Sequence, residues 1–343
     1  MANLTRAHDE LFRRSPDEQF PSLHALVEHC KYEKENSIER WELPQSLRPA
    51  ISRSNENLTI AVGNDGDFLM NDWSFGQLCR LAGVKKNTVN RLSPDTAKRV
   101  FYETLPHGNK PLQLLTNESR VRSIHQASYT RLYNADLLSV VEEFASDFQP
   151  PQKAADGSTG LYFGEQDMFT FLIDPTGWAE INGEAFAPGF FLWNSEVGRR
   201  SIGIQTFWFQ QICRNHIVWD AVEVADFSRK HTSNVHEALD EIRRRIESLV
   251  KSRDERRDGF VKVVKRAMET RLGATSDEVL KELTKNGIPQ SLATKALEIA
   301  QQQGAFTIFA LVDALTRIAG QVENAGDRTE ADQRAASLLA LAI

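Results

Sequence analysis

Short apolar runs dominate the middle of the chain. Between Leu161 and Trp219 these runs are rich in aromatic and β-branched residues, and turn-forming sequences such as Asn182-Gly183 separate them. An Asn-Gly pair between two such runs is the strongest short-range signal for a β-hairpin. The pattern therefore predicts an antiparallel meander, with strands at residues 168–173, 178–181, 190–193, 202–209 and 212–219.

A smaller set of strands is predicted before this meander. Leu58 to Val62 and Phe68 to Met70 flank a Gly-Asn-Asp-Gly turn sequence, which is typical of a hairpin. Residues 112–115 and 119–125 also show strand patterns, and Asp136 to Phe148 has the spacing of an amphipathic helix. The following segment, residues 149–160, is rich in proline, glycine and small polar side chains, which indicates a loop or an internal boundary.

Helical patterns occupy both ends of the chain. From Val235 to Leu272, apolar residues recur at alternating spacings of three and four, which predicts one long helix. Arg253 and Arg256 interrupt its apolar seam, and this favours a bend or a helix that pairs only at its ends. The seam between Leu239 and Ala267 offers a possible contact between copies of the chain. Four shorter helices are predicted at residues 277–286, 291–303, 305–321 and 327–342.

These elements together predict an α+β fold. It has a central antiparallel sheet, a helical N-terminal arm and an all-helical C-terminal region. The predicted domains are the arm at residues 1–56, a mixed α+β core with a strand-rich middle at residues 57–228, and the helical region with one long helix at residues 229–343.

Composition limits the class of protein. With 343 residues, of which 41% are hydrophobic, the chain can bury a substantial core. No apolar run approaches the ~20 residues that span a bilayer, and the first residues carry charges where a signal peptide is apolar, so we expect a soluble cytoplasmic protein that does not bind a membrane. Three widely separated cysteines argue against a disulfide framework and indicate reduced thiols.

The charge is unevenly distributed along the chain. The net charge is -6, which argues against a protein that coats nucleic acid by bulk electrostatics. Residues 229–271, however, hold 13 Lys and Arg against 8 Asp and Glu. Such a segment permits a basic face, although a run of mixed charge is more often a solvated helix surface.

Few motifs of enzymes or cofactor-binding proteins are present. The sequence has no P-loop, no G-x-S-x-G elbow and no dinucleotide fingerprint, and we expect no cofactor. Cys213 and His216 are the nearest approach to a metal-binding pair, but residues three apart on a strand point to opposite faces. Dispersed carboxylates such as Asp167, Asp174 and Glu180 could converge in the fold, and we keep a surface role as the simpler interpretation.

The segment from Trp73 to Thr96 has the spacing of two short helices joined by a glycine turn. One interpretation is a DNA-binding helix-turn-helix. In that case a major groove would be contacted by Lys85, Lys86, Asn87, Thr88 and Asn90. The other interpretation is a helical pair packed on the sheet, which we favour because the pattern is short and degenerate.

Basic and aromatic residues are interleaved in and near the meander. A strand surface that mixes rings with guanidinium groups is typical of a platform for single-stranded nucleic acid, whereas the alternative is that the rings are core and the arginines flank turns. The candidate nucleic-acid-binding residues are Arg120, Arg122, Tyr129, Arg131, Tyr133, Trp193, Asn194, Arg199, Arg200, Arg214 and Asn215.

The chain resembles the phage and plasmid-like protein family catalogued as domain of unknown function 932. The resemblance covers Asp72 to the C-terminus and depends on the order and spacing of individually degenerate motifs. These motifs are Ser119 to Tyr133, Asn194-Ser195-x-x-Gly198, Ile212-Cys213-Arg214-Asn215 and Phe306 to Gly320. The chain departs from the family near the last helix, at Val312-Asp313-Ala314, and at His216. The resemblance implies carriage on a phage, plasmid or integrated element, and it implies no reaction and no catalytic residues.

The resulting hypothesis is a non-enzymatic nucleic-acid-binding protein of a mobile element, which binds or anneals single-stranded DNA as a homo-oligomer. A metal-dependent nuclease that uses the dispersed acids is the first alternative. A protein-binding module that acts in conflict between phage and host is the second.

Overall fold

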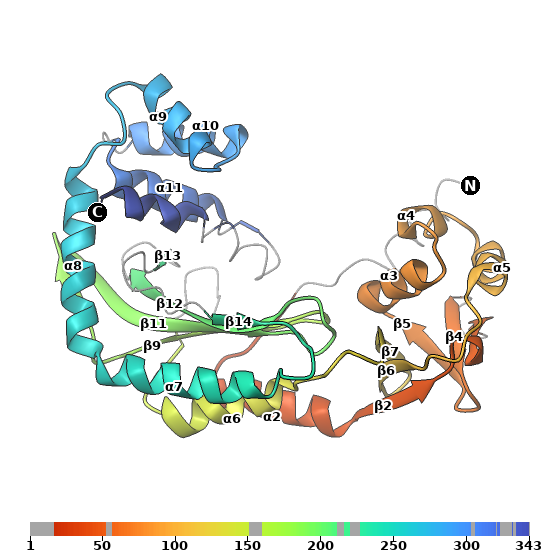
Figure 1. Ribbon diagram of the computed structural model, residues 1–343. Coiled ribbons are helices and arrows are strands. Elements are labelled where there is room, and N and C mark those ends of the chain that lie inside the picture. Colours follow the sequence, from red (N-terminus) through yellow and green to blue (C-terminus); the bar gives the residue numbers. More distant parts are fainter. Residues whose placement is uncertain are drawn as a thin grey trace.

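The chain folds into two lobes, each built around its own sheet (Figure 1). The computed structural model describes residues 17–52, 57–150, 160–210, 216–219, 227–302, 306–319, 321–322, 331 and 334–342. Residues 37–126 form what we call the small lobe, and the rest of the described chain forms the large lobe.

Six strands in the described residues form the sheet of the small lobe, in the order β2-β6-β7-β5-β4-β3. All neighbouring pairs are antiparallel except β5 and β7, which are parallel. The strands are β2 (Ser37–Glu42), β3 (Leu47–Ile51), β4 (Leu58–Val62), β5 (Asp67–Met70), β6 (Leu112–Asn117) and β7 (Arg120–Gln126), and a short 3-10 helix, η1 (Pro44–Ser46), precedes β3.

Three helices cover one face of this sheet: α3 (Asp72–Leu81), α4 (Lys86–Val89) and α5 (Pro94–Thr104). Asn71 caps α3 through a capping box with Ser74, and Gly83, with a positive φ of 69°, ends α3 and leads into the turn before α4. The interpretation of a helical pair packed on the sheet is therefore confirmed. The DNA-reading alternative is not supported, because α4 has only four residues, Asn90 is buried and Lys86 forms an ion pair with Asp72.

The sheet of the large lobe follows the order β1-β8-β9-β11-β12-β13, with β10 beside β11 and β14 beside β12. Asn182 and Gly183, both with positive φ, form the turn between β10 and β11, as the sequence predicts. The described strands are β1 (Glu18–Gln19), β8 (Leu161–Phe163), β9 (Met168–Ile173), β10 (Ala179–Ile181), β11 (Glu184–Asn194), β12 (Ile202–Gln210), β13 (His216–Trp219) and β14 (Phe227–Arg229).

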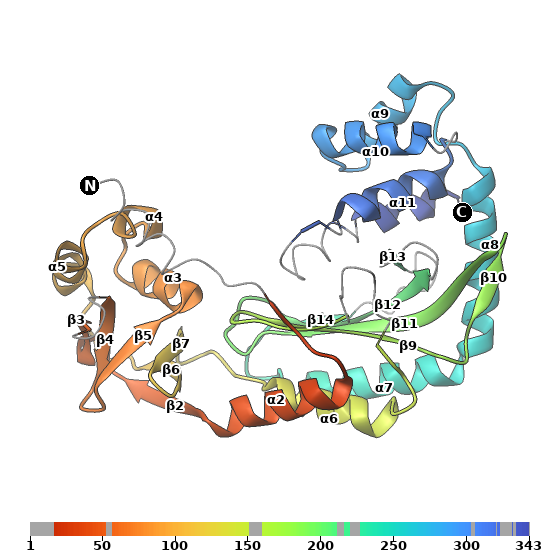
Figure 2. The same cartoon turned by 180° about the vertical axis from the view of Figure 1, so that it is seen from behind.

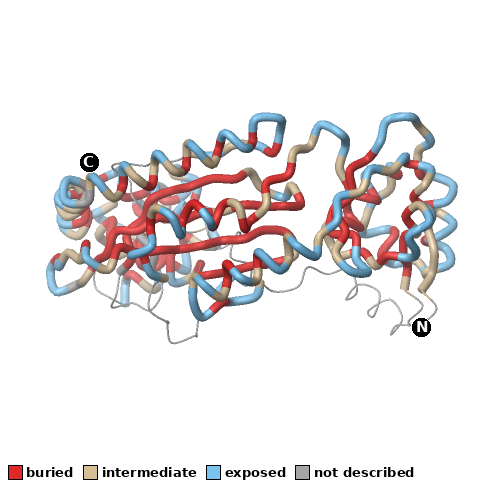
Figure 3. The backbone as a smooth tube through the Cα atoms, turned by 90° about the horizontal axis from the view of Figure 1, so that it is seen from below, coloured by how far each residue is buried: buried red, intermediate tan, exposed pale blue. Residues whose placement is uncertain are grey.

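Helices α2 (Leu23–Glu35), α6 (Asn134–Phe144) and α7 (Glu237–Lys251) lie together across one face of this sheet (Figure 2). Their apolar sides pack with Leu172, Phe190, Leu192 and Ile204 in one core, and their outer sides are exposed (Figure 3). The opposite face of the sheet carries stacked rings, including Phe169, whose ring is nearly parallel to that of Phe191.

A second core of the large lobe lies among its C-terminal helices. These are α8 (Arg253–Glu269), α9 (Ser276–Lys285), α10 (Gln290–Gln302) and α11 (Ile308–Ala319), with the 3-10 helix η2 (Ser337–Ala342) beside them. Trp208 of β12 stacks on Phe260 of α8 with ring centroids 4.0 Å apart, which joins this helical layer to the sheet.

The predicted long helix is divided into α7 and α8, which meet at a corner at Ser252 (Figure 1). Ser252 leaves the helical region with φ −100° and ψ 23°. The two halves of the seam pack on different cores, Ile242 and Ile246 under the sheet and Phe260 and Val264 against α11. The bend is thus confirmed, whereas a single helix is wrong, and the seam is buried within the chain and cannot serve as a contact between copies.

The α+β class is confirmed, and the two sheets refine it. The predicted N-terminal helical arm contains α2 but also the strands β1, β2 and β3. These strands were not predicted, because they are short and partly exposed and so have weak sequence patterns. The predicted end of the arm at residue 56 falls between β3 and β4, which pair with each other. All strands of the small-lobe sheet lie within residues 37–126.

Candidate functional site

The junction between the lobes is formed around one loop of the large lobe. Residues 194–200, the junction loop, connect β11 to β12 at the end of the sheet that faces the small lobe. Asn194 begins the loop and is fully buried, where its side-chain amide donates to Leu132 O at 2.9 Å and to Asn134 Oδ1 at 2.8 Å. The loop is therefore anchored to the start of α6 before it reaches the small lobe.

Backbone carbonyls of the junction loop accept hydrogen bonds from side chains within the small lobe and from the segment that directly follows it. Val197 O accepts from Trp73 Nε1 at 2.6 Å and lies 2.9 Å from His125 Nε2. Because a carbonyl oxygen only accepts, the proton of the neutral His125 ring resides on Nε2. Glu196 O accepts from Tyr129 Oη at 3.0 Å and from the guanidinium of Arg131.

The Glu196 carboxylate is one of the charges enclosed at the junction. Its side chain is 1% exposed, and its oxygens lie 2.9 Å from Arg122 Nη1 of β7 and 2.8 Å from the backbone N–H of Asn134. Arg131, also buried, donates to Glu39 at 2.8 Å. Each buried charge is thus paired, as burial in a region of low dielectric constant requires.

Three rings are stacked beside the loop. His125 lies parallel to Tyr129 with centroids 3.7 Å apart, and His231 follows on Tyr129 at 5.4 Å. Burial, reinforced by the nearby Arg131 charge, lowers the pKa of His125 to about 3. Burial likewise lowers the pKa of His231 to about 4. Both rings are neutral at physiological pH, and burial raises the pKa of Tyr129, so its hydroxyl stays a donor.

Gly198 fits the loop against this stack. It has a φ of 74°, and a Cβ there would lie 2.7 Å from His125 Cε1 and 2.9 Å from Tyr129 Cε2. Only glycine combines this backbone conformation with this close approach.

The surface above the junction exposes two arginines around one indole. The guanidinium of Arg80, on α3 of the small lobe, is 5.3 Å from the centroid of the Trp73 ring. The guanidinium of Arg199, on the junction loop, is 5.9 Å from the same ring. Both arginines are exposed, and neither has an ion-pair partner among the described residues. We call Trp73, Arg80 and Arg199 the two-arginine site.

The acid that precedes Trp73 in the sequence is already paired. Asp72, next to Trp73, forms an ion pair with Lys86 and lies 3.3 Å from Gln166 Nε2. Its charge is therefore largely compensated, and the two-arginine site keeps its positive character.

The structure brings many of the predicted nucleic-acid-binding residues together, but as a buried network rather than as a surface. Arg122, Arg131 and Asn194 are buried and paired, so no strand can reach them. Tyr129 is stacked between two histidines. Tyr133 is half-buried beneath Lys34.

The remaining predicted residues lie apart from one another. Trp193 is half-buried on the sheet face that carries the stacked aromatic rings, and its ring is stacked on Phe191 with centroids 5.0 Å apart. Arg200 forms an ion pair with Asp167 at 2.9 Å. Arg120 is exposed at the far end of β7, about 16 Å along the strand from His125 at ~3.3 Å per residue. Arg214 and Asn215, like Cys213, lie outside the described residues.

Of the predicted surface, Arg199 is the residue that the structure places at the two-arginine site. Trp73 and Arg80 were not predicted as site residues, because they belong to the helical-pair pattern. Glu196 and His125 were not predicted either, because the sequence around a single acid or histidine does not show which residues it contacts. The turn glycine Gly198, between Glu196 and two arginines, is the local feature that marks the loop.

The dispersed acids are not gathered. Asp167 and Asp174 lie at opposite ends of β9, and Glu180 is exposed on β10. Asp174 accepts from the hydroxyl and backbone N–H of Thr176 in a turn. In the part of the chain that the structure describes, no group of three or more His, Cys, Asp or Glu side chains could hold a metal ion.

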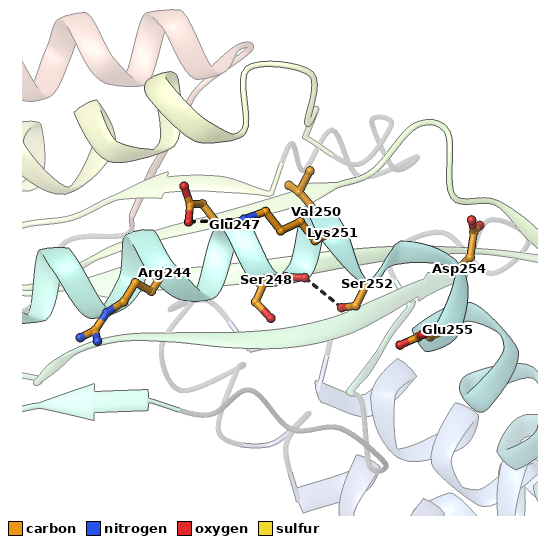
Figure 4. Close-up of a pocket in the computed structure, with 8 residues that line it drawn as sticks. All are labelled: Arg244, Glu247, Ser248, Val250, Lys251, Ser252, Asp254 and Glu255. Atoms are coloured by element: carbon orange, nitrogen blue, oxygen red, sulfur yellow. Dashed lines mark hydrogen bonds and ion pairs between the residues drawn. The ribbon is translucent and has the colours of Figure 1, made fainter.

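A separate hollow of about 620 Å³ lies at the corner between α7 and α8 (Figure 4). Lys251 is 4.0 Å from Glu247, and Ser252 donates to Ser248 O at 2.9 Å. The lining mixes both signs of charge, so it offers no field that would attract a polyanion. Its lining residues are Arg244, Glu247, Ser248, Val250, Lys251, Ser252, Asp254 and Glu255.

Comparison with known proteins identifies the family. Residues 122–337, more than half of the chain, match the family described as domain of unknown function (DUF932), and the chain belongs to it. The match includes the whole junction loop. No curated protein and no solved structure matches the chain. Among the described residues, no helix is both long and apolar enough to cross a bilayer.

Proposed function

We propose that this protein binds single-stranded nucleic acid, most directly DNA, at the junction of its lobes without cleaving it. The two-arginine site carries the proposal. Two exposed guanidinium groups, one from each lobe, lie within 6 Å of one indole and have no ion-pair partner among the described residues.

Guanidinium groups and rings suit this ligand for a physical reason. Arginine presents planar, bidentate donors that match phosphate oxygens, and it keeps its charge at any physiological pH. A ring beside it offers a face for a base, and each stacked base contributes ~1 to 3 kcal/mol. Trp73 is partly exposed, and its N–H is held by Val197 O, so the ring is fixed in orientation before a ligand arrives.

The net charge of -6 shapes the proposal. It favours a local contact with few phosphates over coating of a duplex, because bulk attraction is absent. A protomer with few phosphate contacts binds weakly, and several copies along one strand would add sites. Self-association on a phage or plasmid strand in the cytoplasm is therefore part of the proposal.

A titration tests the binding. Fluorescence anisotropy of labelled single-stranded DNA, duplex DNA and RNA of equal length is measured at several salt concentrations, together with the mass of the complex. We expect single-stranded DNA to bind most tightly, with an affinity that falls as salt rises. Arg80→Ala and Arg199→Ala should each weaken binding about 5- to 10-fold and reduce the salt slope by about 0.7 per lost phosphate contact.

Arg99→Ala is the matched control. Arg99 is also exposed but is paired with Glu103 on the same helix, α5. It should leave both affinity and salt slope unchanged. Binding that is indifferent to salt, or that falls equally in all three variants, would contradict the proposal.

A further inference from the structure

The cores of the two lobes are separate. The apolar core of the small lobe contains residues from Leu47 to Ile124. None of the three cores of the large lobe includes a residue between positions 37 and 126. Within the described residues, no apolar cluster therefore spans the junction, and each lobe is held by its own packing.

Polar contacts and two chain crossings join the lobes instead. The described chain passes between them after α2 and after β7. Across the junction, the contacts include the hydrogen bonds from Trp73 and His125 to Val197 O and the bond from Gln166 to Asp72. The ion pairs Arg122–Glu196 and Arg131–Glu39 also cross it. Water can replace a neutral hydrogen bond at a net cost of only ~0.5 to 1.5 kcal/mol. When the lobes separate, water also solvates both charges of an ion pair, which offsets the loss of their attraction. Domains that meet without a large apolar interface are expected to move relative to each other.

We infer that the lobes hinge at these two crossings and that the junction loop is the latch that holds them closed. Arg80 belongs to the small lobe and Arg199 to the latch itself. Closure therefore assembles the two-arginine site, and opening separates its two cations. The predicted effect on nucleic-acid affinity rests on the proposed function, whereas the predicted motion does not.

Gly198 is the position at which the latch can be released without a change to either core. Its Cβ would meet His125 and Tyr129, both packed against the loop, at 2.7 and 2.9 Å. Gly198→Ala therefore inserts a methyl group into the junction. Gly287→Ala is the matched control, because Gly287 has a similar φ of 81° with nothing within 4 Å and lies in the turn between α9 and α10.

The experiment measures lobe separation and binding in the same full-length samples. Small-angle X-ray scattering gives the radius of gyration, amide hydrogen exchange reports on β7 and the junction loop, and anisotropy gives the affinity for single-stranded DNA. We expect Gly198→Ala to increase the radius of gyration and to speed exchange at the junction at least 10-fold, with both cores still protected. The affinity should fall at least 5-fold, and Gly287→Ala should match the unmodified protein in all three measurements.

The outcomes separate the two proposals. A scattering profile of Gly198→Ala that coincides with that of Gly287→Ala would overturn the latch, whatever the binding result. Expansion in a protein that binds no nucleic acid would support the latch and refute the proposed function. If Gly198→Ala does not fold, His125→Phe provides the same test, because it keeps a ring stacked on Tyr129 and removes one contact between the small lobe and Val197 O.

Discussion

Glu196 illustrates how a single buried charge constrains the junction. Its carboxylate is 1% exposed and is matched by Arg122, whose side chain is 10% exposed. Removing the carboxylate leaves the guanidinium buried without its principal partner, whereas an exposed ion pair can be broken with little loss because water replaces it.

Glu196→Ala should therefore lower the free energy of unfolding by about 3 to 5 kcal/mol. Glu103→Ala, which breaks the exposed pair with Arg99, should change it by less than about 0.5 kcal/mol. Urea unfolding followed by circular dichroism measures both variants. Similar small losses in the two variants would show that the buried network contributes little to stability.

The two buried histidines predict a pH dependence of stability. The pKa values of His125 and His231 are about 3 and about 4 in the folded chain, against an ordinary value near 6.5. At pH values between the folded and the ordinary pKa, the unfolded chain therefore binds more protons than the folded chain. The free energy of unfolding is thus not reduced by these histidines above pH 6.5. It falls as the pH is lowered, by up to ~1.4 kcal/mol per pH unit for each histidine.

His231→Phe tests this dependence while it keeps a ring beside Tyr129. The slope of unfolding free energy against pH, measured by urea titration between pH 7 and pH 5, should fall by the contribution of about one proton. An unchanged slope would mean that His231 is protonated equally in the folded and unfolded chain.

At the level of single residues, the sequence identified many of the right positions but not their environment. Arg122, Arg131 and Asn194 were predicted to bind nucleic acid at an exposed surface, and all three are buried. Alternation along a strand says which residues share a face, but it does not say whether another lobe covers that face. The partners of these residues, such as Glu39 and Glu196, are 92 and 74 positions away, a separation that no local pattern reports.

Among the strands, β11 and β12 show how a small residue accommodates a large one. Trp193 and Gly203 are directly opposite in the antiparallel register. The indole lies over the glycine, in the space where a Cβ would be, and the carbonyl oxygen of Phe227 closes the other side.

Gly203→Ala should therefore destabilise the protein by about 1 to 3 kcal/mol through overpacking. Gly259→Ala is the opposite case, because Gly259 lies inside helix α8 with nothing within 4 Å. That change should stabilise the protein by about 0.5 to 1 kcal/mol, since alanine loses less backbone entropy in a helix. Thermal denaturation of both variants gives the comparison, and a loss of stability in both would contradict the packing argument.

Elements were predictable where the local pattern is strong. The hairpins at residues 58–70 and 179–194 and the helices α6, α9 and α10 follow directly from turn residues and apolar spacing. β2 and β3 were not predicted, because partly exposed strands near prolines lack clear alternation. The separation of α7 from α8 at Ser252 could be anticipated only as a bend, since the corner depends on two different cores.

For the molecule as a whole, the division into two sheets governs the proposed function. If all the arginines lay on one face of a single sheet, binding would depend on the surface of that sheet alone. The structure instead divides the exposed cations between two lobes that meet through polar contacts. Nucleic-acid affinity should then depend on the relation between the lobes.

A double-mutant cycle across the junction tests this claim most directly. The affinity for single-stranded DNA is measured for the unmodified protein, Arg80→Ala, Arg199→Ala and the double variant at one low salt concentration. Because both arginines should contact the same ligand segment beside Trp73, we expect the double variant to lose about 5-fold less than the product of the single losses, a coupling of about 1 kcal/mol. Losses that multiply independently, or single variants that bind as well as the unmodified protein, would contradict a shared site between the lobes.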